Sequence, residues 1–283
     1  MMRLVIVGAS GLIGSAVETA ARKAGHEVVG TYATRPRDGL RRFDVTKENL
    51  LDVVPDLAAA DRVMLMSAAI DQGWVQAHPG ESHAVNYIGA IEVASAALSR
   101  GAHLIFMSSE AVFGGVDGGH DEMSPPWPVS LYAQQKFKVE ERLPRGEACV
   151  VRTGSVVGWR PEDDRCAVSN TYRALSGNGA RMARDNVLTV TAVEDVAAAL
   201  LKLAEDRTCG VVHVAAGPPV RRTELADWIV QLSRRGGAMS YRPTVLAEIP
   251  AKVGRGWLLS TVKCAAGPRS VVERKVAILD EGN

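Results

Sequence analysis

The sequence predicts an α/β protein, built on a doubly wound parallel sheet with a smaller, mainly C-terminal subdomain. Short runs rich in β-branched residues alternate with helical patterns over roughly the first 150 residues. Such alternation is typical of right-handed βαβ units and a parallel sheet. Residues 154–187 are loop-rich, and the tail from Gly236 is irregular and interrupted by prolines. We therefore expect the chain to leave the sheet after its first half.

The first half supplies the expected strands, which are short apolar segments. In chain order they are Arg3–Val7, Glu27–Thr31, Arg41–Phe43, Asp61–Met66, His103–Met107 and Ala148–Val151. The expected helices are Leu12–Ala24, Glu81–Arg100 and Val129–Leu143. Gly25 and Gly101 follow the first two helices, where a left-handed residue often ends a helix.

The pattern of the later segments predicts that the chain returns to the sheet. They are a strand near Val187–Val190, a helix over Val193–Ala204, a strand over Val211–Val214 and a helix over Thr223–Arg234. We therefore expect a first domain of residues 1–153, to which residues 187–216 return. Residues 154–186 and 217–283 form the expected second subdomain.

Composition limits the function classes. The chain has 283 residues, 47% of them hydrophobic and 23% charged, with a formal net charge of +1. This balance gives no electrostatic footprint for nucleic acid or a membrane surface. We expect no bilayer-spanning segment, no signal peptide and a cytoplasmic location. The four cysteines form no CxxC pair and the histidines no ligand spacing, so we expect neither a disulfide framework nor a metal site.

A glycine cluster lies in the stretch LVIVGASGLIGSAVETAARKAGHEVVGTY, at Gly8, Gly11 and Gly14. The cluster follows an expected strand and opens an expected helix. There, small residues let the backbone approach a pyrophosphate, and free N–H groups at the helix start can hold it. A glycine-rich turn is the alternative, but this context favours a dinucleotide.

The end of the second expected strand indicates which dinucleotide. An acidic residue there is typical of NAD-binding folds, because it binds the ribose 2′-hydroxyl. The stretch GTYATRPR has no acid, and Arg35 and Arg37 can meet a 2′-phosphate instead. A solvated basic loop is the alternative. Asp44 can accept from the adenine amino group, or it is a turn or helix-capping aspartate before VTKENL.

A second motif, YAQQK, places Tyr132 and Lys136 on one face of a helix. A lysine ammonium near a phenol lowers the tyrosine pKa, and such a tyrosine can exchange a proton with an alcohol or carbonyl. Ser109, in LIFMSSEAVFGG, follows the fifth expected strand, where ligands bind in doubly wound sheets. Its neighbour Ser108 is expected to be a capping serine. Asn86 can connect the lysine to solvent through a water, or it is an ordinary exposed helix residue.

Together, GASGLIG, Asn86, SSEAVFGG and YAQQK resemble an extended short-chain dehydrogenase/reductase, over roughly residues 1–235. Within that family the chain looks most like the dTDP-4-dehydrorhamnose reductases, which reduce a nucleotide-linked 4-ketosugar with NADPH. The resemblance implies a Rossmann fold, NADP(H) as cofactor with NAD(H) as the alternative, and a nucleotide sugar as the small-molecule partner. It leaves a homodimer open.

The resemblance also implies roles for individual residues. The implied catalytic residues are Ser109, Tyr132, Lys136 and Asn86, with Lys136 lowering the tyrosine pKa and holding the nicotinamide ribose. The implied cofactor-binding residues are Gly8, Ser10, Gly11, Leu12, Ile13, Gly14, Arg35, Asp44, Val45, Ala68, Ala69, Tyr132 and Lys136.

Some positions depart from the group's pattern. The group usually carries Thr-Asp-Tyr at Ser109-Glu110-Ala111, and a tryptophan near the sugar at Ser155. These departures put the identity of the sugar in doubt. Two other functions remain open: a nucleotide-sugar epimerase or dehydratase, and a non-catalytic NADP-binding regulatory subunit, because a methionine adenosyltransferase regulatory subunit resembles the same group. Arginines of the second subdomain are candidates for binding a diphosphate: Arg160, Arg165, Arg173, Arg181 and Arg184.

Overall fold

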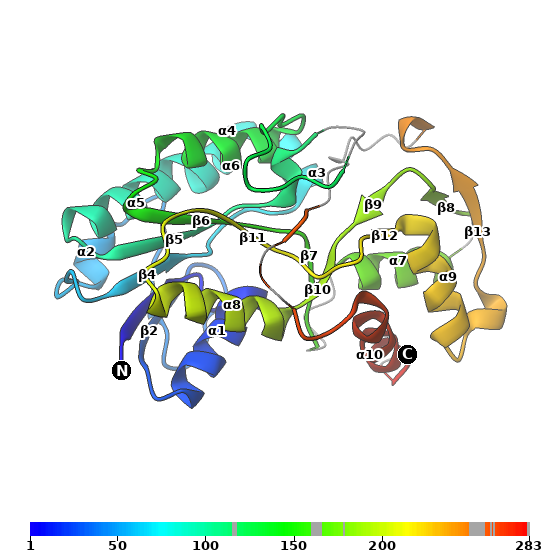
Figure 1. The fold of residues 1–283 in the computed structure, drawn as a ribbon, viewed down its shortest axis with the longest axis horizontal. Coiled ribbons are helices and arrows are strands. Elements are labelled where there is room, and N and C mark those ends of the chain that lie inside the picture. Colours follow the sequence, from blue (N-terminus) through cyan, green and yellow to red (C-terminus); the bar gives the residue numbers. More distant parts are fainter. Residues whose placement is uncertain are drawn as a thin grey trace.

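A seven-stranded parallel sheet forms the larger part of the computed structural model (Figure 1). The structure describes residues 1–114, 118–159, 166–177, 179–248, 258–260, 262 and 264–281. The sheet has the strand order β11-β6-β5-β4-β1-β2-β3. The strands are β1 (Arg3–Val7), β2 (Glu27–Tyr32), β3 (Arg41–Arg42), β4 (Arg62–Leu65), β5 (His103–Met107), β6 (Ala148–Thr153) and β11 (Gly210–Val214). The order reverses between β1 and β4, which is where doubly wound sheets bind ligands at the carboxyl ends of the strands.

Helices cover both faces of this sheet. One face packs against α1 (Leu12–Lys23) and α8 (Val193–Glu205), through a buried cluster that includes Val17 and Leu200. The other face packs against α2 (Leu50–Val53), α5 (Ala90–Ser99) and α6 (Leu131–Arg142). The helices between β4 and α5 are α3 (Gln72–Ala77), α4 (Pro79–His83) and a π-helix at Ala84–Gly89. A 3-10 helix, Glu110–Val112, follows β5.

The C-terminal part of the chain packs beside the sheet on its own apolar core, at the right of Figure 1. Its strands form three pairs: β7 (Ser155–Val157) with β10 (Val190–Ala192), β9 (Val187–Leu188) with β12 (Val220–Arg221), and β8 (Ala180–Ala183) with β13 (Tyr241–Thr244). Its helices are α7 (Ala167–Ser176), α9 (Arg222–Leu232) and α10 (Pro268–Glu281), with 3-10 turns at Gly236–Ala238 and Leu246–Glu248.

The structure corrects three expectations. The segment expected to return to the main sheet near Val187–Val190 pairs with β12 and β7 instead, whereas α8 and β11 do return. The long helix expected over Glu81–Arg100 is divided by the π-helix. The tail expected to be irregular contains α10. Pro268 does not interrupt this helix, since it occupies the first helical position, where proline is tolerated.

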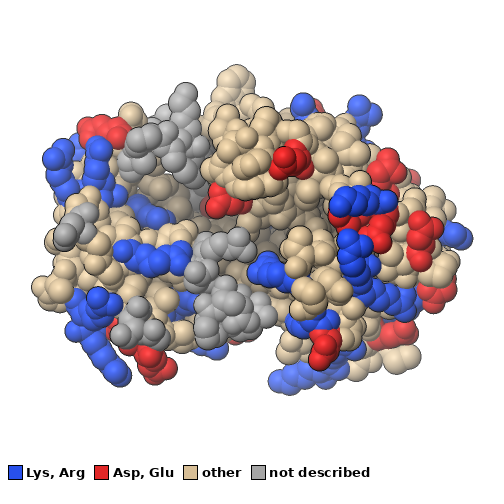
Figure 2. All heavy atoms as spheres, turned by 180° about the vertical axis from the view of Figure 1, so that it is seen from behind, with Lys and Arg blue, Asp and Glu red and all other residues tan. Residues whose placement is uncertain are grey.

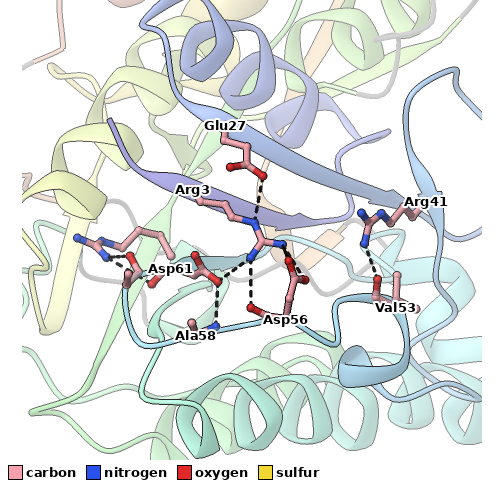
Figure 3. Close-up of polar contacts among 9 residues, drawn as sticks. Arg3, Glu27, Arg41, Val53, Asp56, Ala58 and Asp61 are labelled. Atoms are coloured by element: carbon pink, nitrogen blue, oxygen red, sulfur yellow. Dashed lines mark hydrogen bonds and ion pairs between the residues drawn. The ribbon is translucent and has the colours of Figure 1, made fainter.

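An ion cluster holds the amino ends of the sheet strands together (Figure 3). The Arg3 guanidinium of β1 pairs with Glu27 of β2 at 3.2 Å, Asp56 at 2.9 Å and the buried Asp61 at 3.1 Å. Asp61 directly precedes β4 and also accepts from the Ala58 N–H at 2.9 Å. The cluster therefore stabilises the edge opposite to the carboxyl ends of the strands.

Within the described ranges, no helix is both long enough and apolar enough to cross a bilayer. In the same part of the chain, no group of three or more His, Cys, Asp or Glu side chains could hold a metal ion.

Candidate active site

The glycine-rich turn between β1 and α1 has a backbone that side chains would obstruct. Gly8 has φ +94°, and a Cβ there would lie 2.9 Å from the Ser67 nitrogen. A Cβ at Gly14 would lie 2.4 Å from the Gly8 carbonyl oxygen. Gly11 caps α1 without any side-chain hydrogen bond, and the first turn carries no acidic residue. A pyrophosphate binds to free backbone N–H groups at the start of a helix, where no side chain obstructs its approach. These residues therefore fit a dinucleotide.

The basic loop after β2 separates the two arginines. Arg37 is held by Glu18 and donates to the Ala9 carbonyl at 3.1 Å. Arg35 is exposed, and among the described residues it has no hydrogen bond or ion pair. Of the two, Arg35 is the one available to an external phosphate.

Asp44 takes the geometry of a turn aspartate. Its carboxylate accepts from the Thr46 N–H at 3.0 Å and from the Thr46 hydroxyl at 2.7 Å, and it pairs with Lys47 at 3.4 Å. These partners hold the pKa of Asp44 below its usual range, with the Thr46 hydroxyl contributing most. The neighbouring Val45 is buried against Gly89 of the π-helix. The contacts thus show a turn aspartate, and a role toward adenine remains a prediction.

Asn86 is buried in the π-helix, so an exposed position is excluded. Its Oδ1 accepts from the Ala69 N–H at 2.8 Å, and its Nδ2 donates to the Ala69 carbonyl at 3.0 Å and to Gln135 Oε1 at 2.9 Å. Gln135 in turn donates to the Ser82 hydroxyl at 2.9 Å. These bonds fix the segment of Ala68 and Ala69 after β4 against α6. Gln135 was not expected here, because nothing in the sequence marks a helix glutamine as buried.

Ser109, Tyr132 and Lys136 meet at the carboxyl end of β5. Ser109 lies beside Tyr132, and its hydroxyl acts to lower the pKa of the phenol. Ser109 Oγ also accepts from the Ala111 N–H at 3.2 Å, which caps the 3-10 helix. One turn along α6, the buried Lys136 donates to the Met107 carbonyl at 2.9 Å, and its Nζ lies 4.7 Å from the centre of the Phe106 ring. The expected serine, tyrosine and lysine therefore lie together.

Burial dominates the electrostatics of this group. Burial raises the pKa of Tyr132 to about 12, and only the Ser109 hydrogen bond opposes that shift. Lys136 is not among the groups that shift the pKa of Tyr132, and its ammonium donates to the Met107 carbonyl. Burial lowers the pKa of Lys136 itself to about 8, against the charge of Glu140. That Lys136 lowers the tyrosine pKa stays a prediction.

Ser108 is not the capping serine that the sequence predicts. It is buried, and its hydroxyl donates to Glu140 Oε1 of α6. The cap is made by Ser109 instead. The serine expected to be structural thus connects β5 to a buried carboxylate.

Glu110 joins the site to the C-terminal part of the chain. Its Oε2 accepts from the Thr189 hydroxyl at 2.6 Å. A Cβ at Gly154 would lie 1.8 Å from that hydroxyl, so only glycine fits beside it. Burial raises the pKa of Glu110 to about 8, and the Thr189 bonds oppose the shift. Seen from behind, the surface is hollowed between the two halves of the molecule (Figure 2).

The arginines expected to bind a diphosphate are divided. Arg160 and Arg165 lie outside the described residues. Arg173 donates to Asn170 at 2.7 Å, and Arg181 pairs with Glu248 at 3.0 Å. Arg184 is exposed.

The sequence pattern did not single out Arg222. Burial lowers its pKa, and among the described residues no carboxylate pairs with it. The backbone N–H of Arg222 donates to the Asn186 carbonyl at 2.8 Å. The buried Oδ1 of Asn186 has no hydrogen-bond partner among the described residues. Because buried charges are normally paired, this guanidinium is a candidate for an anionic ligand.

Comparison with known proteins places the chain in a family. The family model described as the RmlD substrate binding domain matches residues 2–264. The chain belongs to this family.

Curated relatives carry several names. A probable low-salt glycan biosynthesis reductase of Haloferax volcanii is 26% identical over 90% of this chain and 87% of its own. A dTDP-4-dehydrorhamnose reductase of Mycolicibacterium smegmatis is 30% identical over 75% of this chain and 64% of its own length. The methionine adenosyltransferase 2 subunit beta of Bos taurus is 25% identical over 79% and 70%. Reductases and a subunit named for another enzyme thus share this family's sequence pattern.

Solved structures share the fold over nearly their whole length. A dTDP-4-dehydrorhamnose reductase of Clostridium acetobutylicum superposes with a TM-score of 0.82 at 20% identity, covering 98% of this chain and 99% of its own. The Bacillus anthracis enzyme of the same name, in complex with NADP, gives 0.78 at 20% identity with the same coverage. MoeE5, in complex with UDP-glucuronic acid and NAD, gives 0.82 at 22% identity over 99% and 100%. The Rossmann-type fold is thereby shown.

Proposed function

We propose that this protein is an NADPH-dependent ketoreductase that acts on a nucleotide-linked 4-keto-deoxy sugar. The observation that carries the proposal is the meeting of Ser109, Tyr132 and Lys136 at the carboxyl end of β5. Membership of the RmlD family supports a nucleotide sugar as substrate. A hydroxyl pair beside a buried ammonium is suited to proton exchange at a carbonyl oxygen.

The cofactor is assigned to residues whose shape fits it. Gly8, Ser10, Gly11, Leu12, Ile13 and Gly14 surround the pyrophosphate in this proposal. Arg35 meets the 2′-phosphate, Asp44 and Val45 the adenine, and Ala68 and Ala69 the ribose and nicotinamide side. Bound NADPH supplies a hydride, which is chemistry that no side chain of the protein offers.

The side chains handle the proton. With a pKa of about 12, Tyr132 is a neutral phenol at pH 7 and therefore holds the proton that a reduced carbonyl oxygen must receive. Ser109, which lies beside Tyr132, holds the same oxygen in this proposal. Lys136 keeps its position through the Met107 carbonyl and binds the nicotinamide ribose. A positioned general acid of this kind contributes about 10²–10⁴-fold in rate.

The substrate is assigned to the C-terminal part, residues 154–186 and 217–283. The unpaired Arg222 is the strongest candidate there for the diphosphate. Ser155, where the related reductases usually carry tryptophan, leaves a smaller side chain and supports a different sugar or a more tolerant pocket.

Two alternatives would use the same fold. An epimerase or dehydratase retains its cofactor, usually NAD, and the available Arg35 argues instead for NADP(H). A regulatory subunit would bind cofactor without turnover. The neighbouring Ser109 and Tyr132 hydroxyls favour an enzyme.

The Tyr132→Phe variant tests the assignment. It removes one hydroxyl, so fold and NADPH affinity should survive while NADPH oxidation with a nucleotide-linked 4-ketosugar falls by about two to four orders of magnitude. Tyr87→Phe is the matched control, because no hydrogen bond of its hydroxyl is found among the described residues. An unchanged rate in Tyr132→Phe would remove the catalytic assignment. A parent that binds NADPH but turns over no ketosugar would favour the regulatory subunit, and turnover only of free ketones would exclude the nucleotide sugar.

A further inference from the structure

The buried carboxylate of Glu140 has no role in the function proposed above. It lies one helical turn from Lys136 and contacts the segment that carries Ser109. Glu140 lies on α6 and is 8% exposed. Arg152 of β6, 4% exposed, donates to it through Nε at 3.2 Å to each oxygen and through a terminal nitrogen at 2.6 Å. This pair is fully within the protein, between α6 and the sheet.

The same carboxylate reaches the segment that carries Ser109. The Ser108 hydroxyl donates to Glu140 Oε1, and the Ser108 N–H donates to the Val151 carbonyl at 2.7 Å. Lys136 donates to the preceding carbonyl, that of Met107. Two side chains one helical turn apart therefore hold consecutive residues of the segment that leads to Ser109.

Glu140 also supplies charge. It is the one charged side chain that raises the pKa of Lys136 against burial. Tyr132 on α6, Glu110 after β5 and Arg152 on β6 are titratable or charged groups on the packed elements, and none of them contributes to that pKa. Arg152 is turned toward Glu140 and His213 of β11, whose Nε2 lies 3.5 Å away.

From these contacts we propose that Glu140, oriented by Arg152, is a positioning residue that fixes Ser109 through Ser108 and preserves the ammonium charge of Lys136. The proposal rests on the function proposed above. A buried ion pair with only a folding role is the competing explanation. That role predicts a loss of stability on removing either partner and no change at the lysine.

Matched variants separate the two explanations. Glu140→Gln keeps the shape and can still accept from Ser108, but it removes the negative charge. Arg152→Met breaks the same ion pair and leaves that charge in place. The lysines are labelled with ¹³C and the Cε shift of Lys136 is followed against pH, with Lys136→Met providing the assignment. This measurement needs neither substrate nor turnover.

We expect the pKa of Lys136 to fall by about one unit or more in Glu140→Gln, because removing a nearby opposite charge disfavours the ammonium by about that much. In Arg152→Met it should not fall. If Glu140→Gln does not fold, Glu140→Gln with Arg152→Met removes both charges, and it should titrate below Arg152→Met alone. Equal lysine pKa values with and without the Glu140 charge would overturn the proposal.

Turnover supplies the second readout. The alkaline limb of NADPH oxidation should move to lower pH in Glu140→Gln together with the lysine. Ser108→Ala should lower kcat with little change in NADPH affinity, because it releases the Ser109 segment but leaves Lys136 bonded to Met107. A Ser108→Ala enzyme with the parent's kcat would contradict the positional half of the proposal. A parent without turnover would reject the proposed function and leave the lysine titration to decide the charge effect.

Discussion

At the residue scale, we expect cofactor preference to depend on one side chain that makes no hydrogen bond or ion pair with the described residues. Arg35 has no partner among the described residues, whereas Arg37 is held by Glu18. We predict that NADPH binds more tightly than NADH, and that Arg35→Ala weakens NADPH binding by about tenfold to a hundredfold with little effect on NADH. This is the usual worth of a hydrogen bond to a charged group. Calorimetric titration of both cofactors measures it.

Arg37→Ala is the control for this prediction. It removes an equal charge from the same loop. We expect it to lower the stability of the fold instead, because it leaves the buried Glu18 carboxylate without its Arg37 partner. If the parent binds NADH as tightly as NADPH, Arg35 has no role at the 2′-phosphate.

Single residues also show how far a motif predicts chemistry. YAQQK and the serine after β5 predicted correctly that Ser109, Tyr132 and Lys136 come together, because helix periodicity and sheet order determine which side chains meet. The tyrosine pKa could not be predicted in the same way. It depends on how deeply the phenol is buried and on the position of the Ser109 hydroxyl, neither of which has a signal in the motif.

At the scale of elements, α9 brings the half-buried Arg222 guanidinium to the β9–β12 strand pair. Arg222 begins this helix, and its burial costs free energy that an anionic ligand would offset. We predict that Arg222→Gln raises KM for the nucleotide-linked ketosugar by about tenfold or more, with NADPH affinity unchanged. Steady-state kinetics at saturating NADPH measure the change.

Arg221→Gln provides the comparison, since the neighbouring Arg221 is exposed. An equal rise in KM for a free ketone would show that the Arg222 variant damages the site generally. An unchanged KM for the nucleotide-linked substrate would remove Arg222 from the diphosphate.

Elements differ in how well their sequences predict them. β1 and β5 have the bounds that their apolar runs predict, because a buried parallel strand has one dominant requirement. The division of the helix around Asn86 could not be predicted, since a π-helix has no propensity signature. The bonds of Asn86 to Ala69 and Gln135 accompany it, and these partners are distant in sequence.

At the scale of the whole molecule, the main sheet could be predicted and the C-terminal part largely could not. The sheet repeats one unit, whereas the C-terminal part uses two- to four-residue strands whose pairing depends on distant segments. Thr189 illustrates this. It lies between β9 and β10, away from the main sheet, yet its hydroxyl donates to Glu110, the residue that follows Ser109.

The burial of Glu110 should make the stability of the molecule depend on pH. The pKa of Glu110 rises from 4.5 to about 8 on folding, so between these values the folded protein keeps a proton that the unfolded chain releases. Stability contributed by this group is therefore complete below pH 4.5 and is lost as pH rises toward 8. The slope is at most about 1.4 kcal/mol per pH unit.

Glu110→Gln can still accept from Thr189 but cannot ionise, so its stability should exceed the parent's increasingly from pH 5 to 8. Denaturant titrations at each pH measure the difference, with Glu141→Gln on the exposed side of α6 as the control. Parallel stability curves for the parent and Glu110→Gln would show that the Glu110 carboxyl is not buried against Thr189 in solution.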